Sequence, residues 1–78
     1  MRLDKFLKMA RIIKRRTIAN EAADAGRVSV NGKVVKPSYE VKVGDFIEIK
    51  FGDKLSKFEV LKIPTVQSKD VTDIIKIL

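Results

Sequence analysis

The sequence predicts a small α+β domain in which two N-terminal helices, joined by a basic elbow, pack on a small, mostly antiparallel sheet. Two periodicities support this prediction. Apolar residues recur about every 3.6 positions near the N-terminus and every second position from Val28 onward, which are the periods of an amphipathic helix and a half-buried strand. A chain of 78 residues forms one domain with a thin core.

The first helix is expected at residues 2–13. Its core-facing residues are Leu3, Phe6, Leu7, Ala10 and Ile13. Projection at about 100° per residue places Arg2, Lys5, Met9 and Ile12 on one flank and Asp4, Lys8, Arg11 and Arg15 on the other. A longer helix would bring Lys14 onto the apolar stripe, so we expect the helix to end or bend near Lys14 and residues 14–16 to form the turn.

Thr17 is the expected N-cap of the second helix, because its hydroxyl can accept a hydrogen bond from a backbone N–H two or three residues further on. This helix should run to about Ala25, with Ile18, Ala22 and Ala25 facing inward, and end at a left-handed Gly26. Four of the first six residues of the stretch 11–20 are Lys or Arg. We call residues 11–20 the basic elbow.

The first hairpin is predicted at residues 28–35. Val28 and Val30 alternate with a polar residue, and Asn31-Gly32 favours a tight turn because both residues tolerate positive φ. Pro37 lacks an N–H, so strand pairing should loosen near it.

Further strands are expected at residues 46–51 and 55–63, with glycine turns before and between them. We expect the main folded domain to span residues 1–64. The tail, 65–78, fits either a short helix, because Val71, Ile74, Ile75 and Leu78 have helical spacing, or an edge strand, because residues 74–78 are rich in β-branched side chains. We favour a short helical turn at about 69–73 followed by an extended end.

Positive charge is concentrated in the first half of the chain. The sequence holds 17 Lys and Arg against 10 Asp and Glu, a net charge of +7. Residues 1–36 hold ten cations and three acids, whereas residues 37–78 hold seven of each. All five arginines lie in the first 27 residues, and clustered arginine favours bidentate contacts to phosphate. The first half therefore predicts a surface that faces a polyanion.

The composition argues against several classes of protein. Without Cys or His, the chain lacks a disulfide, a Cys/His metal site and the commonest catalytic groups. The acids are scattered, and we expect a non-enzyme without a cofactor or metal. Apolar runs are too short for a membrane span or a signal peptide. A reducing cytoplasm is the expected location.

The candidate RNA-binding residues lie on the first helix, the basic elbow and the first hairpin. They are Arg2, Lys5, Arg11, Lys14, Arg15, Arg16, Thr17, Arg27, Asn31 and Lys33. Clustered cations and the positive end of a helix dipole form the electrostatic footprint of phosphate binding. We expect the greatest contribution from Arg16.

Other binding modes fit the sequence less well. Residues 19–24 are short and acidic for a helix that reads a DNA major groove. Base stacking on a sheet needs exposed aromatics, whereas the aromatics mostly resemble core residues: Phe6, Tyr39, Phe46, Phe51 and Phe58. A membrane-surface role would use the apolar face that the core requires. A protein-interaction module whose basic face docks an acidic partner stays open.

Motifs in residues 2–51 resemble the RNA-binding domain named after small-subunit ribosomal protein four. They are Arg2-Leu3-Asp4, Arg16-Thr17-x-Ala19, Gly26-Arg27-Val28-x-Val30-Asn31-Gly32 and Gly44-Asp45-x-Ile47. The resemblance implies an αL-shaped RNA platform built from the two helices and the hairpin. It implies RNA contacts from Arg2, Lys5, Arg16, Thr17, Asn20, Arg27 and Asn31.

The chain is most similar to stand-alone members of this family, of the RqcP type of bacterial ribosome-associated quality control. Residues 3–8, 13–17, 23–27 and 51–54 carry this resemblance. It implies binding to large-subunit rRNA and peptidyl-tRNA on obstructed large subunits, and assistance to an RqcH-type factor that adds alanine tails. A heat-shock protein fifteen-like role without tailing is the alternative. The free chain is expected to be a monomer.

Overall fold

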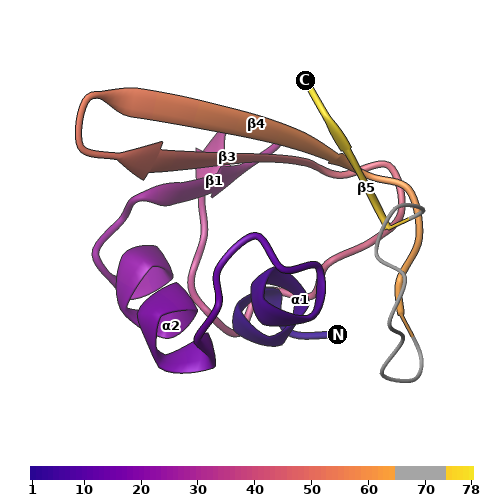
Figure 1. Cartoon of the computed structure of the whole chain (residues 1–78), viewed down its shortest axis with the longest axis horizontal. Helices are drawn as coiled ribbons and strands as arrows, with labels where there is room; N and C mark the ends of the chain where they lie inside the picture. Colours follow the sequence, from indigo (N-terminus) through magenta and orange to yellow (C-terminus); the bar gives the residue numbers. More distant parts are fainter. Residues whose placement is uncertain (65–73) are drawn as a thin grey trace.

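The computed structural model describes residues 1–64 and 74–78 and shows a helical layer beneath an antiparallel sheet (Figure 1). The elements are α1 (Leu3–Met9), α2 (Arg16–Asp24), β1 (Val28–Val30), β2 (Lys33–Val34), β3 (Phe46–Phe51), β4 (Lys54–Val60) and β5 (Ile75–Ile77). The strand order is β2-β1-β3-β4-β5, and all neighbouring pairs are antiparallel. The predicted α+β class is confirmed.

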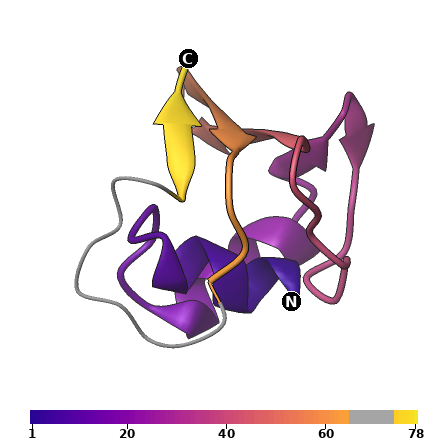
Figure 2. The same cartoon turned by 90° about the vertical axis from the view of Figure 1, so that its right-hand side faces the viewer.

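The core lies between the two layers, which Figure 2 shows from the side. All five apolar residues predicted for the first helix are buried, as are Val28, Val30, Ile47 and Ile49 from the sheet. The second helix contributes only the alanines Ala19, Ala22 and Ala23. Small side chains let α2 approach α1 closely.

The predicted inner face of the second helix is partly wrong. Ala22 is buried as expected, but Ile18 is 46% exposed and Ala25 is also exposed. The helix is rotated so that Ala19 and Ala23 face α1 instead. Close contact between the helices favours small residues at the interface. Apolar periodicity alone instead predicts that the larger Ile18 faces inward.

The first helix ends earlier than residue 13, because Arg11 adopts the left-handed conformation with φ 58°. The Arg11 N–H donates to the Lys8 carbonyl (3.0 Å) and the Ile12 N–H to the Leu7 carbonyl (3.0 Å), which is the Schellman pattern of helix ends. The turn therefore begins at Arg11 and not near Lys14. Ile13 reaches the core from this turn.

The prediction that Thr17 is an N-cap is wrong. The cap residue is Arg15, in extended conformation and without a side-chain cap bond, so α2 starts at Arg16. The Arg15 carbonyl already accepts from the Ala19 N–H (3.1 Å), which leaves Thr17 inside the first helical turn. At the other end Gly26 has φ 79°, and the Arg27 N–H reaches the Ala22 carbonyl (3.0 Å). The expected left-handed glycine is confirmed.

The first hairpin turns at Asn31 and Gly32, which have φ values of 52° and 84° as predicted. Asp45, which is 8% exposed, stabilises this turn through hydrogen bonds. Its carboxylate accepts from Asn31 Nδ2 (3.1 Å) and the Tyr39 hydroxyl (3.1 Å), while Asn31 Oδ1 accepts from the Phe46 N–H (3.0 Å). Burial, with the bond to Asp45 and its charge, raises the pKa of Tyr39.

The last strands differ from the prediction in one boundary. Strand β4 ends at Val60 and not at residue 63, because the next two N–H groups donate to the Ile74 carbonyl. The expected edge strand at the end of the chain is confirmed, since β5 pairs with β4. The helical turn expected at 69–73 lies outside the described residues.

Two of the five aromatics are not core residues. Phe6 and Phe58 are buried, but Phe46 is 47% and Phe51 45% exposed. Phe46 alternates with the buried Ile47 and so points to the outer face of the sheet. Phe51 alternates in phase with the buried Ile47 and Ile49 but is the last residue of β3 before the Gly52 turn. There it borders an open depression beside α2 and is not enclosed by the core.

Candidate nucleic-acid interface

A buried carboxylate organises the cations where the two helices meet. Asp4 is 2% exposed, and its oxygens accept from Arg2, Arg16 and Asn20. The distances are 3.4 Å from Arg2 Nη2, 3.5 Å from Arg16 Nη2 and 3.2 Å from Asn20 Nδ2. Three candidate residues from separate parts of the sequence therefore share one anchor.

Each arginine presents the same edge to Asp4. The Nε atoms of Arg2 and Arg16 lie 3.3 and 3.5 Å from its oxygens, in addition to the Nη2 contacts. A guanidinium has five N–H donors. Since the contacts with Asp4 use Nε and Nη2, the Nη1 donors of both arginines take no part in them. The two side chains are 52% and 46% exposed, so both arginines are accessible to a ligand.

The position of Arg2 differs from the helical projection, which placed it on the flank opposite Asp4. Arg2 is the cap residue of α1 and has extended backbone angles, so its side chain is not bound by the helical period. It reaches Asp4 from outside the helix. No pattern in the sequence identifies Asp4 as the shared partner, although an acid in the first turn of a cationic helix is a recognisable signal.

Asp4 remains ionised in this environment. Burial raises the pKa of its carboxyl, but hydrogen bonds from Asn20 and the Lys5 backbone N–H (2.8 Å), together with the positive charge of Arg16, outweigh burial. The net effect lowers the pKa of Asp4 below its usual value of 3.8. A charged Asp4 holds both guanidinium groups throughout the neutral range.

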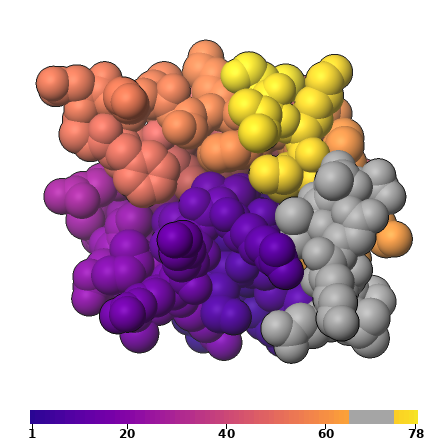
Figure 3. Space-filling model, viewed as in Figure 1, coloured from indigo at the N-terminus to yellow at the C-terminus, as the bar shows by residue number. Residues whose placement is uncertain are grey.

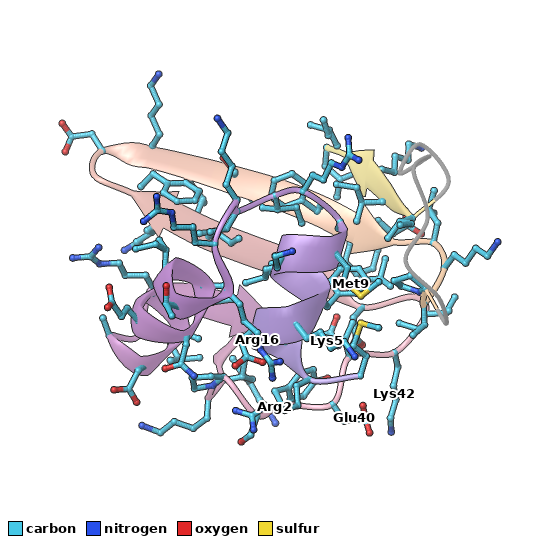
Figure 4. All side chains as sticks on the ribbon, turned by 60° about the horizontal axis from the view of Figure 1, so that its bottom comes forward. Arg2, Lys5, Met9, Arg16, Glu40 and Lys42 are labelled. Carbon is cyan, nitrogen blue, oxygen red and sulfur yellow. The ribbon has the colours of Figure 1, made fainter. Side chains whose placement is uncertain are left out.

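Figure 4 shows Arg2, Lys5 and Arg16 next to one another on the side of the helical layer away from the sheet. Lys5 is exposed and follows Asp4 on α1. Arg16 and Asp4 also border a shallow depression together with Thr17, Asn20 and Glu21. The structure thus brings Arg2, Lys5, Arg16, Thr17 and Asn20 together, and we call these five residues with Asp4 the Asp4 cluster.

Three further candidates lie in the segment between the two helices. Arg11, Lys14 and Arg15 are exposed in the segment that rises from α1 toward the sheet before it descends to α2 (Figure 1). In the space-filling view, the helical part of the chain forms one continuous block below the sheet (Figure 3). These cations extend the positive surface from the Asp4 cluster toward the sheet.

The hairpin residues form a separate group. Arg27 and Lys33 are exposed, but no described contact joins them to Asp4. The Asn31 side chain bonds Asp45 and the Phe46 N–H, so in this structure both ends of its amide group hold the turn.

Two other features are absent from residues 1–64 and 74–78. No group of three or more Asp, Glu, His or Cys is arranged to hold a metal ion there. In the same part of the chain, no helix has the length and apolar character needed to cross a membrane.

Comparison with known proteins gives the same family. The model of the S4 domain matches residues 1–47. The chain is 53% identical to the RQC P-site tRNA stabilizing factor of Streptococcus pneumoniae over 70 residues, which are 90% of this chain and 80% of that protein. The Bacillus subtilis protein of the same name is 50% identical, with 90% and 81% covered. Small ribosomal subunit protein uS4 of Rhodopseudomonas palustris is 38% identical, over 97% of this chain and 37% of its own.

Solved structures agree with these relatives. Heat Shock Protein 15 of Vibrio cholerae, described as trimeric, superposes with a TM-score of 0.89 at 29% identity and covers 100% of this chain and 81% of its own. The solution structure of the hypothetical protein HP1423 has a TM-score of 0.84 at 34% identity, with 100% and 96% covered. The chain therefore belongs to the S4 domain family, in the group of the RQC P-site tRNA stabilizing factors.

Proposed function

We propose that the chain is a non-catalytic RNA-binding factor whose main phosphate contacts come from the Asp4 cluster. The observation that carries this proposal is the pair of guanidinium groups that one buried carboxylate holds at the helix junction. Asp4 limits the side-chain freedom of Arg2 and Arg16 before RNA arrives, so less conformational entropy is lost on binding. The Nη1 donors, which do not bond Asp4, then meet phosphate oxygens as charge-assisted hydrogen bonds.

The RNA in this proposal is rRNA and tRNA on obstructed large ribosomal subunits. The name of the S. pneumoniae and B. subtilis relatives, RQC P-site tRNA stabilizing factor, supports a tRNA ligand in ribosome-associated quality control. We extend the proposal to peptidyl-tRNA and to assistance of an RqcH-type factor in alanine tailing of stalled chains. The chain would act in the cytoplasm, as a monomer when free, which sedimentation equilibrium tests.

The direct test compares two variants that remove one positive charge each. We expect Arg16→Gln to weaken binding to large ribosomal subunits and tRNA at least tenfold, because its guanidinium sits in the Asp4 cluster. Lys62→Gln removes an exposed charge from the half of the chain with no net charge and should change affinity less than twofold. Filter binding and gradient sedimentation measure both, and equal losses would contradict the role of the cluster.

A second candidate function is a heat-shock protein fifteen-like role, in which the chain binds blocked large subunits without assisting alanine tailing. The TM-score of 0.89 to Heat Shock Protein 15 of V. cholerae favours this candidate. A reaction with obstructed large subunits, alanyl-tRNA and an RqcH-type factor separates the two. Longer alanine tails on addition of the chain support assistance, whereas subunit binding with unchanged tails supports the second candidate.

A protein-interaction module is the remaining alternative. Complexes with an acidic protein and complexes with RNA are both sensitive to salt, because both depend on the same exposed cations. Pull-down with and without nuclease distinguishes them. Partners that survive removal of RNA would contradict an RNA ligand.

A further inference from the structure

A second depression on α2 contains a half-exposed aromatic ring. It lies between α2 and the end of β3, and its apolar lining comes from Ile18, Ala22, Ala25 and Phe51. Phe51 and Ile18 are 45% and 46% exposed. Large apolar side chains in a concave, solvent-facing position are typical of binding sites.

Two cations border this ring. Arg27 and Lys50 line the same depression. Arg27 directly precedes β1 and Lys50 lies on the adjacent β3, and the Lys50 N–H donates to the Arg27 carbonyl (3.0 Å). An aromatic ring beside positive side chains is the combination that binds single-stranded nucleic acid, because the ring stacks on a base and the cations contact phosphate.

The exposed Phe46, in contrast, lacks this combination of a depression and neighbouring cations. Its exposed fraction, 47%, is close to that of Phe51, but it lies on the outer face of the sheet and lines neither of the two depressions on α2. Its partner on β4 is the acidic Glu59. Phe46 is therefore a matched control for Phe51.

The second depression adjoins the Asp4 cluster. Glu21 lines both depressions, so they meet across α2. One RNA strand that runs along α2 can contact Arg16 and Thr17 at the start of the helix and also reach Phe51, which lies beside the C-terminal half of α2. Charge complementarity and continuity with the candidate interface both favour RNA as the occupant.

We propose that this depression binds an unpaired RNA base, which stacks on the Phe51 ring while Arg27 and Lys50 contact the flanking phosphates. The inference deepens the proposed function and rests on it. It assigns to the chain a contact with single-stranded or unstacked RNA, in addition to the phosphate contacts of the Asp4 cluster.

The first experiment places a reporter in the depression. The sequence contains no Trp, so in Phe51→Trp all tryptophan fluorescence comes from this position. The full-length variant is titrated with a ten-nucleotide single-stranded RNA and with a fully paired duplex of the same strand. We expect the single strand to quench the emission and the duplex to leave it unchanged at equal occupancy. Equal quenching by both, or none by the single strand at saturation, would overturn the proposal.

The second experiment measures affinity for the same single strand. Phe51→Ala should weaken binding about 5- to 150-fold, the range for loss of one stacked base. Phe51→Leu should lose nearly as much, because it keeps apolar volume but no ring, and Phe46→Ala should change affinity less than twofold. Thermal melts by circular dichroism identify any variant that is unfolded. Equal losses for Phe51→Ala and Phe46→Ala contradict the proposal.

The outcomes separate this inference from the proposed function. If binding depends on Arg16 but not on Phe51, the base site is wrong and the RNA-binding function stands. If the unmodified chain binds no RNA, the proposed function itself fails. If Phe51→Ala loses large subunits in sedimentation but keeps its affinity for the single strand, a protein partner covers the depression and the base site is wrong.

Discussion

Asp4 links the two helices and anchors the arginines of the proposed RNA-binding surface. Its buried carboxylate accepts hydrogen bonds from α2 and from the cap of α1. We expect Asp4→Asn to lower the free energy of unfolding by about 1–3 kcal/mol, because hydrogen bonds to a charged acceptor are lost. The new Asn NH2 group would also face the N–H donors of Arg2, Arg16 and Asn20. RNA affinity should fall as well, since Arg2 and Arg16 lose their anchor. Chemical denaturation and filter binding measure the two effects.

The matched control is Asp53→Asn. Asp53 lies exposed in the turn after Gly52, and surface changes of this kind stay within about 0.5 kcal/mol. Loss of the same stability in both variants would show that net charge, and not the anchor, is responsible.

The pH dependence of stability follows from the lowered pKa of Asp4. A carboxyl with a lower pKa in the folded state stabilises the fold fully above its unfolded pKa and loses that contribution as the pH falls through the folded pKa. The difference in unfolding free energy between the wild type and Asp4→Asn should therefore be constant above about pH 5 and shrink below about pH 4. A difference that instead grows on acidification would contradict the assigned direction.

The two helices end in the same backbone motif with different residues. Gly26 occupies the left-handed position after α2, and Arg11, with φ 58°, occupies it after α1. A non-glycine residue in this conformation is strained by about 1–2 kcal/mol, and such strain is concentrated at functional sites. Arg11 thus combines strain with an exposed charge in the basic elbow.

Arg11→Gly should relieve the strain and raise the free energy of unfolding by about 0.5–1 kcal/mol, less than the full strain because glycine also gains freedom in the unfolded chain. It should weaken RNA binding, because a cation is lost. Arg11→Ala is the control, since it removes the same charge and keeps the strain. Equal stability of the two variants would show that the left-handed backbone at Arg11 is unstrained.

In the whole molecule, the asymmetry of charge along the sequence separates the helices and the first hairpin from the remaining strands. Residues 1–36 carry the entire net charge and form the helices and the hairpin of β1 and β2, whereas β3, β4 and β5 come from the half without net charge. If about five phosphates are neutralised, the slope of log K against log salt should be about −3.5 to −4.5. Titration at several salt concentrations measures it, and a slope near zero excludes phosphate contacts as the main source of affinity.

Much of the fold is predictable from local signals. The left-handed Gly26, the Asn31-Gly32 turn and the strand at residues 46–51 all have the predicted positions, because φ preferences and alternation depend on neighbouring residues alone. The candidate cations were also predictable as a group, since clustered arginine is visible in the sequence.

The details of the site depend on packing between segments far apart in the sequence. Asp4 meets Arg16 and Asn20, which are 12 and 16 positions away, and this contact exists only because α1 and α2 cross at small alanines. The left-handed Arg11 and the exposed Phe51 likewise follow from how the layers meet. Periodicity assigns residues to faces, but the tertiary structure decides which side chains share a partner, because that depends on distances that no local pattern contains.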